Sequence, residues 1–416
     1  MPGVAEFRAF CEGQSKSELA EVLSYSEAND AFSIEADGGR CARRLEDGDA
    51  RVLVDGVMIA GLPLAAVSLR NHALGDAGAH EIARLLKRGP ASRPQRPSRC
   101  VERSLHRLGG DDGEDVTTEA IAHYSPVVTS LNLRGNALGP IGAASVVAAA
   151  QRNATLVSLD LSWNALGKAG GLRIAALLAA RGPLKELRLA HASLDLEAVV
   201  AVLAQVRAGS PLELLDVSGC IIQAEHQDDI ASHAASALLR HAALRSLALD
   251  GNRIGDDGCA VLAQALADND VLESLSLRGN RIRGGGAAAL ADTLVLRGAD
   301  GPLRMLDLKS NQITDEGADA LADALSRDVS LMSLHVGDND IGDRGLEALA
   351  KALLLNHRLE KLRAWGNHFG PLANEQFHEL LNGANDADVA LDFTTYLVDG
   401  ILHTAEKEAR ASAAFN

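Results

Sequence analysis

The chain has 416 residues, of which 47% are hydrophobic but only 3% are aromatic, and its formal net charge is −16. Nucleic-acid binding requires a basic surface, so this acidic balance argues against a nucleic-acid partner. The five cysteines, Cys11, Cys41, Cys100, Cys220 and Cys259, are few and far apart. They exclude a disulfide framework and indicate a reducing compartment.

Residues 1–60 lack the periodic pattern of the rest of the chain, and we interpret them as an N-terminal cap. The start, MPGVAEFRAFCEG, has no basic segment followed by an apolar stretch, so we expect no signal peptide. The sequence predicts an amphipathic helix over 15–28, a degenerate strand over 32–34 and a second helix over 48–61. The strand and the second helix could form an atypical first repeat unit.

From Leu64 onward the template L-x-x-L-x-L-x-x-N-x-[LI]-x-x-x-G recurs, for example as LRSLALDGNRIGDDG from Leu244 and LRMLDLKSNQITDEG from Leu303. The usual period is 28 residues, with insertions at 89–99, 223–229 and 297–301. The first insertion is rich in Pro and Arg, and we expect an exposed loop there. We place eleven unit starts at Leu64, Cys100, Val128, Leu156, Leu184, Leu212, Leu244, Leu272, Leu303, Leu331 and Leu359. The unit at Cys100 fits least well because it lacks the Asn.

Each part of the template has a physical reading. The L-x-x-L-x-L segment has period two, which predicts a short strand with one apolar face. The Asn amide can both donate and accept, so it can satisfy backbone groups of its own turn and of the neighbouring unit. The acidic residues before the Gly are typical of a helix N-terminus, and a helix follows. Stacked units share one core, so residues 61–382 are expected to form an α/β solenoid with a parallel concave sheet and convex helices.

The pattern stops near Asn382, and residues 383–416 are interpreted as a C-terminal cap and tail. Val389, Leu391 and Phe393 alternate with polar residues, so they predict an added edge strand. We expect a short helix and a tail after that strand.

The sequence contains no catalytic or metal-binding signature. It has no G-x-x-x-x-G-K-[ST] loop and no G-x-S-x-G elbow. His80 and His378 each begin a His-Glu pair like that of a zinc motif, but Arg84 and Asn382 stand where the second histidine is required. We therefore expect no enzyme activity, no cofactor and no metal.

The remaining candidate for function is the face formed by strand residues that point away from the core. Trp and Arg dominate many protein interfaces, and both tryptophans fall on this face. Trp163 could instead be an ordinary variant of the repeat, and Trp365 could pack against the C-terminal cap. Acid and base alternate along the face, which suits a protein surface better than a polyanion. The residues predicted to bind protein are Arg134, Asp160, Trp163, Arg188, His191, Asp307, His335, Arg363 and Trp365.

The repeats over 64–381 resemble the ribonuclease-inhibitor-like leucine-rich-repeat superfamily. That superfamily includes ribonuclease inhibitor, the Ran GTPase-activating protein and the repeat halves of NOD-like receptors. The segment LDFTTYLVDGILHTAE (391–406) is similar to the ending of the leucine-rich-repeat-containing protein 34 group. The resemblance implies a non-enzymatic protein of cilia, flagella or the nucleolus. The matching residues are Asp392, Tyr396, Val398, Asp399, Gly400 and Ala405.

Three functions are therefore open. The first is a non-catalytic, cytoplasmic protein-binding scaffold in a larger assembly such as an axoneme, with no nucleic-acid, membrane or small-molecule ligand. The second is a Ran-type GTPase activator using Arg70 or Arg134, although neither lies in a family motif and the acidic tail of that family is absent. The third is an innate-immune-type repeat sensor. It requires an upstream nucleotide-binding domain, for which we expect no room before Met1.

Overall fold

The computed structural model describes residues 2–26, 31–37, 44–60, 62, 64–86, 128–220, 229–240, 243–382 and 389–407. Contacts within the chain divide it into two compact units, Met1–Gln205 (unit 1) and Val206–Asn416 (unit 2). Strands and helices alternate through most of both units, as the repeat predicts.

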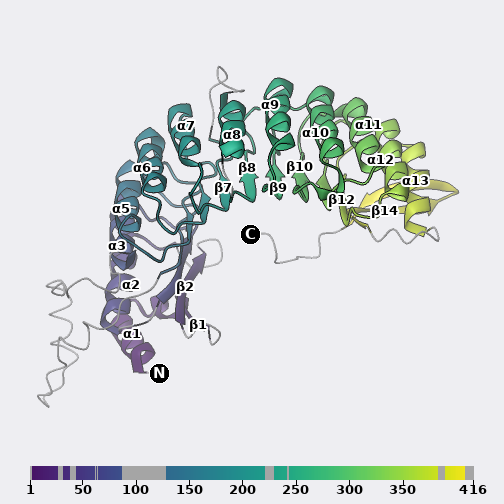
Figure 1. Ribbon diagram of the computed structural model, residues 1–416. Coiled ribbons are helices and arrows are strands. Elements are labelled where there is room, and N and C mark those ends of the chain that lie inside the picture. Colours follow the sequence, from purple (N-terminus) through teal and green to yellow (C-terminus); the bar gives the residue numbers. More distant parts are fainter. Residues whose placement is uncertain are drawn as a thin grey trace, which may run out of the picture. The chain divides into compact units, whose positions relative to one another are not determined.

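Unit 1 is a sheet with helices along one face (Figure 1). The strand order is β1-β2-β3-β4-β5-β6; β1 and β2 are antiparallel, and the strands from β2 onward are parallel. The elements are α1 (Pro2–Gly13), η1 (Ser17–Val22), β1 (Leu23–Ser26), β2 (Ala31–Asp37), α2 (Asp47–Ala60), β3 (Leu64–Arg70), α3 (Asp76–Leu86), β4 (Ser130–Asn132), α5 (Pro140–Ala150), β5 (Ser158–Asp160), α6 (Gly167–Ala179), β6 (Glu186–Arg188) and α7 (Leu196–Gln205).

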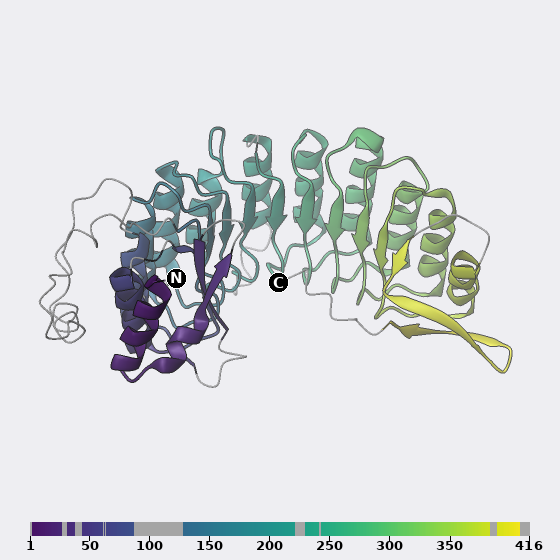
Figure 2. The same cartoon turned by 90° about the horizontal axis from the view of Figure 1, so that it is seen from below.

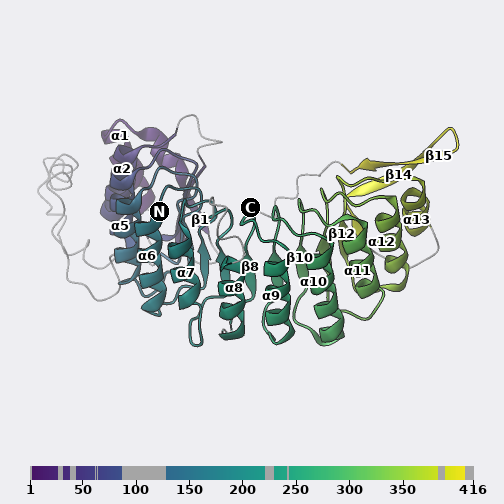
Figure 3. The same ribbon diagram turned by 90° about the horizontal axis from the view of Figure 1, so that it is seen from above.

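Unit 2 repeats this arrangement, and Figure 3 shows its helices α8 to α13 in a row beside the strands. Parallel strands follow in the order β7 to β13, and β14 and β15 form a separate antiparallel pair. The elements are β7 (Leu214–Asp216), α8 (Asp229–Arg240), β8 (Ser246–Ala248), α9 (Asp256–Ala267), β9 (Ser274–Ser276), α10 (Gly284–Arg297), η4 (Gly298–Asp300), β10 (Met305–Asp307), α11 (Thr314–Leu325), β11 (Ser333–His335), α12 (Asp343–Leu355), β12 (Lys361–Arg363), α13 (Pro371–Asn382), β13 (Ala390–Leu391), β14 (Phe393–Val398) and β15 (Ile401–Glu406).

The template leucines build the core between sheet and helices. In β4 the central Leu131 is buried and its neighbours are half-buried, and Leu133 just after the strand is fully buried. The same pattern recurs in β9 around Leu275 and in β11 around Leu334. Each strand is short because only the L-x-L stretch alternates before the chain turns to its helix. The predicted α/β leucine-rich-repeat solenoid is therefore confirmed as the fold class.

The predicted role of the template Asn is also confirmed. Asn164 Nδ2 donates to the carbonyl oxygens of Leu161 in its own repeat and Leu133 in the preceding one, and its Oδ1 accepts from Leu138 N–H. Asn311 makes the equivalent bonds in unit 2. A buried backbone group without a partner is costly, so this amide holds consecutive turns together. A second series, which the sequence analysis missed, lies at the other end of the helices at Asn153, Asn269 and Asn356.

Several acidic residues at the helix starts cap the following helix, whereas Asp195 caps its own helix α7 by accepting from Ala198 N–H. Asp315 lies in the first turn of α11, but its Oδ1 accepts from Gly342 N–H at 2.6 Å and Gly345 N–H at 3.2 Å at the start of α12. Asp76 does the same for α5 through Gly139 and Gly142. This arrangement corrects the sequence interpretation and explains the recurring Gly, because a Cβ on Gly142 would lie 2.6 Å from the Asp76 carboxylate.

The stack passes directly from the Leu64 repeat to the Val128 repeat. Ala66 in β3 pairs with Ser130 in β4, and Asp76 caps α5. The repeat predicted at Cys100 and the Pro/Arg-rich loop predicted at 89–99 lie outside the described residues.

The N-terminal region differs from the helix predicted over 15–28. There the chain forms the short 3₁₀ helix η1 and then β1, which pairs with β2 in the register Leu23↔Ile34. Strand pairing thus overrides the local helical spacing of apolar residues. Helix α1 was not predicted. In contrast, β2 pairs in parallel with β3 and α2 follows it, so this pair stacks as the atypical first unit that the sequence suggested.

The C-terminal region also differs in part from its prediction. The added edge strand is present as β13, paired with β12. The short helix predicted after it is wrong, because β14 and β15 form a hairpin beside α13 (Figure 2). Asp399 and Gly400 at its tip both have positive φ, of 50° and 81°, as a two-residue hairpin turn requires.

Candidate functional site

Three predicted binding residues of unit 1 come together in the turns that follow β4, β5 and β6. Trp163 follows β5, and the residue is 51% exposed. The His191 ring, after β6, lies 4.2 Å from it between centroids, and Arg134 Cζ, after β4, lies 6.0 Å from the Trp163 ring centroid. We call these three residues the platform. Its ring faces and guanidinium can contact apolar and charged groups of a ligand.

Trp163 and His191 occupy the turn position just before the template Asn, where the backbone is left-handed. Their φ values are 58° and 52°. Glycine is the commonest residue at this position and holds it in half of the described repeats, because a left-handed conformation costs other residues roughly 1–2 kcal/mol. The position is held, in chain order, by Asn71, Gly135, Trp163, His191, Gly219, Gly251, Gly279, Ser310, Asp338 and Gly366, all with positive φ. Among these described turns, only Trp163 and His191 carry a ring.

The other two predicted residues of unit 1 are occupied by internal contacts. Asp160 is only 6% exposed, and its Oδ1 accepts from Ser162 N–H at 2.9 Å. Arg188 Nη1 lies 2.9 Å from Glu186 Oε2, which also accepts from Ser158 Oγ. Both residues therefore border the platform, while Arg134, Trp163 and His191 present its exposed groups.

In unit 2 the structure pairs two predicted residues directly. His335 Nδ1 lies 3.2 Å from Asp307 Oδ2 on the neighbouring strand. Burial acts to raise the pKa of Asp307, but the hydrogen bond and charge of His335, with Lys309 N–H, outweigh it, so the pKa is lowered.

Asp250 is a further acidic residue of this face, outside the predicted set. Burial is the main cause that raises its pKa to about 6, and the charges of Asp307 and Asp216 add to it. Ser276 Oγ and Arg278 N–H both donate to its Oδ1 and partly offset the rise. Unit 2 therefore presents a face on which two nearby carboxylates have opposite pKa shifts.

The last two predicted residues behave differently from each other. Arg363 at the end of β12 is exposed. Trp365 stacks on Phe369 at 6.1 Å, and Phe369 contacts Phe377 of α13 and Phe393 of the C-terminal cap. Of the two readings of Trp365, the structure supports packing against the cap.

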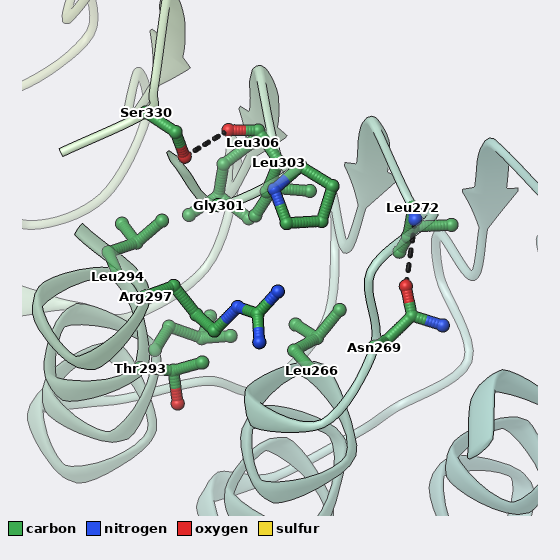
Figure 4. A pocket seen from close by; sticks show the side chains of 12 residues that line it. Leu266, Asn269, Leu272, Thr293, Leu294, Arg297, Gly301, Leu303, Leu306 and Ser330 are labelled. Carbon is green, nitrogen blue, oxygen red and sulfur yellow. Dashed lines mark hydrogen bonds between the residues drawn. The ribbon is translucent and has the colours of Figure 1, made fainter. Parts of the chain in front are cut away.

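A pocket in unit 2 accompanies the insertion at 297–301. Figure 4 shows the Arg297 side chain extending into it among apolar residues such as Leu266 and Leu303. Arg297 Nη1 donates to the Ala267 carbonyl oxygen and Nη2 pairs with Asp270. Its buried Nε has no hydrogen-bond partner within the described part of the chain. The pocket is occupied by its own arginine, which is tethered to the end of α9, so we do not assign it a ligand.

The hairpin presents an apolar surface that the sequence analysis did not anticipate. Its exposed large side chains are Tyr396 (45%), Leu397 (62%), Val398 (46%) and Ile401 (62%). The hairpin is anchored to α13, where Asn374 Nδ2 donates to the Leu402 carbonyl oxygen and His378 Nδ1 lies 3.0 Å from Thr395 Oγ1. The Asp-Gly pair at its turn was the sequence signal that could have predicted the hairpin.

The described residues contain no group of three or more His, Cys, Asp or Glu side chains that could hold a metal ion. His80 contacts Ser145 Oγ at 3.4 Å, and the adjacent Glu81 pairs with Arg84. Over the described ranges, no helix is both long and apolar enough to cross a membrane.

Comparison with known families gives six matches to the family described as Leucine Rich repeat. They cover residues 124–147, 152–175, 242–263, 268–291, 302–322 and 328–350. The chain is a leucine-rich-repeat protein. No curated protein sequence matches it.

Solved structures similar to this leucine-rich-repeat protein include actin-binding site 2 of leiomodin-1 and the tropomodulin C-terminal domain of Caenorhabditis elegans. Their identities are 22% and 11% and their TM-scores 0.27 and 0.30; each match covers 38% of this chain and 91% of the other. An internalin of Listeria monocytogenes is 17% identical with a TM-score of 0.31, covering 63% of this chain and 78% of its own.

Proposed function

We propose that this leucine-rich-repeat protein is a non-catalytic scaffold that binds a protein partner on the sheet face of unit 1. Repeats of this kind are typically non-catalytic, and their function resides in surfaces displayed by the stack. We assign the functional side chains to the sheet side of the unit because the helices line its other side (Figure 1).

The platform is the observation that carries this proposal. Trp163 is half exposed in a chain with only 3% aromatic residues, and it stands where glycine would relieve the backbone. Trp163 is not one of the buried core residues, and a large ring beside an arginine is typical of residues that dominate protein interfaces. A binding role accounts for a side chain that local stability alone does not favour.

We further propose a place in a cytoplasmic assembly such as the axoneme of a cilium or flagellum. The support is the resemblance of residues 391–406 to the leucine-rich-repeat-containing protein 34 group. A fluorescently tagged full chain, imaged in ciliated cells, is expected along the cilium. A signal spread evenly through the cell and absent from cilia would contradict this location.

The binding proposal is tested by proximity labelling in the source cell, followed by affinity measurements with the purified candidate partner. The Trp163→Gly variant is expected to weaken binding at least about tenfold, as hot-spot residues do. The control is Ile141→Ser, which changes an apolar residue of α5 that is 71% exposed on the helix side of the same unit. Equal affinity of wild type and Trp163→Gly would remove the platform from the binding site.

A further inference from the structure

We infer that the platform recognises an acidic segment of the partner, with a carboxylate on Arg134 and an adjacent apolar side chain on the Trp163 ring. This inference rests on the proposed function and names the chemistry of its ligand. It depends on the charges around the platform, on the exposed ring surface and on the cost of placing that surface at this turn.

The charge on Arg134 is the first argument. Arg134 is exposed, and within the described residues it takes part in no ion pair. Its backbone N–H donates to Asn132 Oδ1, so the loop fixes the base of the side chain. The nearby carboxylates are already engaged: Glu186 pairs with Arg188, and Asp160 is buried against its own turn. A guanidinium without a carboxylate partner favours an anionic ligand group, which it can bind through two parallel hydrogen bonds.

The ring surface is the second argument. Trp163 and His191 are tilted by 38° and lie 4.2 Å apart, so they form one continuous aromatic surface across two repeats. Arg134 borders it from the preceding repeat at 6.0 Å. A carboxylate on Arg134 therefore places the neighbouring ligand residue over the indole. An apolar side chain such as leucine or proline would be desolvated there.

The backbone is the third argument. Because Trp163 has a φ of 58°, glycine fits this turn better than tryptophan does. Gly135, Gly219, Gly251 and Gly279 hold the same position in other repeats. Trp163→Gly thus introduces the commonest residue of this turn. The variant should lose binding without losing stability if Trp163 has a binding role, and should lose stability if its role is structural. Its thermal midpoint should be equal to or above that of wild type, whereas a fall of more than about 4 °C would mark Trp163 as structural and overturn the inference.

A direct test uses the fluorescence of Trp163. The chain has two tryptophans, so Trp365→Phe leaves Trp163 as the sole indole, and phenylalanine keeps an apolar ring against Phe369. This full-length variant is titrated with a ten-residue peptide of Asp, Glu, Leu and Pro. Matched peptides carry Lys, or Asn and Gln, in place of the acids. The acidic peptide is expected to give a saturable blue shift that weakens at high salt.

Two further variants, both in the Trp365→Phe background, test whether Arg134 supplies the charge that binds the acidic peptide. Arg134→Gln should lower the affinity for the acidic peptide at least about tenfold, as loss of a charge-assisted pair does. Arg173→Gln, which removes an exposed arginine of α6 in the same unit, should leave the affinity unchanged. No shift with the acidic peptide, an equal shift with the Lys peptide, or unaltered affinity in Arg134→Gln would each overturn the inference. A shift produced by single-stranded DNA but not by the acidic peptide would also overturn it.

The two proposals fail in different ways. If the partner binds wild type but not Trp163→Gly, while acidic peptides give no shift, the proposed function stands and the acidic segment is wrong. If the partner binds Trp163→Gly and wild type with equal affinity, both the acidic segment and the proposed binding site are wrong.

Discussion

The side chain of His72 takes the place that asparagine holds in most repeats. Its Nδ1 accepts from Leu45 N–H at 3.1 Å, as the Asn oxygen does elsewhere, and only 3% of the residue is exposed. Burial lowers its pKa from the ordinary 6.5, more than the Ala36 backbone and Asp37 raise it. The unfolded chain therefore binds more protons than the folded chain as the pH falls below about 6.5.

His72→Asn should remove a pH dependence from folding. In wild type, the His72 contribution is complete above pH 6.5 and is lost as the pH falls toward its lowered pKa. The variant restores the template residue, so its thermal midpoint should fall less between pH 7.5 and pH 5. The control is His80→Asn, which changes an exposed histidine of the same unit. An identical midpoint loss in all three proteins would contradict this account.

Asp250 and Asp307 should respond oppositely to substitution by asparagine. A pKa raised from 3.8 to about 6 means that ionised Asp250 costs stability as the pH rises through 6, by at most about 3 kcal/mol. Asp250→Asn keeps an acceptor for Ser276 and should raise the free energy of unfolding at pH 7.5 but not at pH 4. Asp307 has a lowered pKa, so Asp307→Asn should lower the free energy of unfolding at pH 7.5. Urea unfolding at both pH values checks this, and destabilisation by both variants at pH 7.5 would refute it.

At the scale of elements, the aspartates that cap the following helix hold neighbouring repeats together. Asp315→Ala removes the acceptor for two N–H groups of α12 and should cost about 1–2 kcal/mol, the usual range for a helix cap. Asp319→Ala is the matched control, because Asp319 forms only an exposed ion pair with Arg344 and should cost no more than about 1 kcal/mol. Chemical denaturation measures both, and equal losses would rule out the capping role.

The sequence predicts most of the stack because its determinants are local. Period-two leucines and a bonding Asn specify strand and turn within one repeat, as Leu131 and Asn136 show. Contacts set by stacking were not predictable. The aspartate–helix caps of unit 2 join residues 27–30 positions apart, and β1 forms only because β2 lies beside it. The C-terminal hairpin did carry a local signal, Asp399-Gly400, between apolar residues.

The candidate site was predictable only in part for the same reason. Strand periodicity placed Arg134, Trp163 and His191 on one face. The stacking of Trp163 on His191 depends on two left-handed turns in adjacent repeats, which neither residue type would suggest. The glycines at equivalent positions of other repeats were the available signal. For Trp365 the sequence left two alternatives open, the groove and the C-terminal cap, because the partners of its neighbour Phe369, Phe377 and Phe393, lie in the last helix and in the hairpin.

At the scale of the whole molecule, the central claim is that the partner binds to the sheet face of unit 1 and not to its helices. Hydrogen–deuterium exchange of the full chain, with and without the purified partner, tests this most directly. The account predicts slower exchange on binding in the turns after β4, β5 and β6, around residues 134–136, 162–165 and 190–193. Slower exchange confined to the exposed faces of α5, α6 and α7, with those turns unchanged, would contradict it.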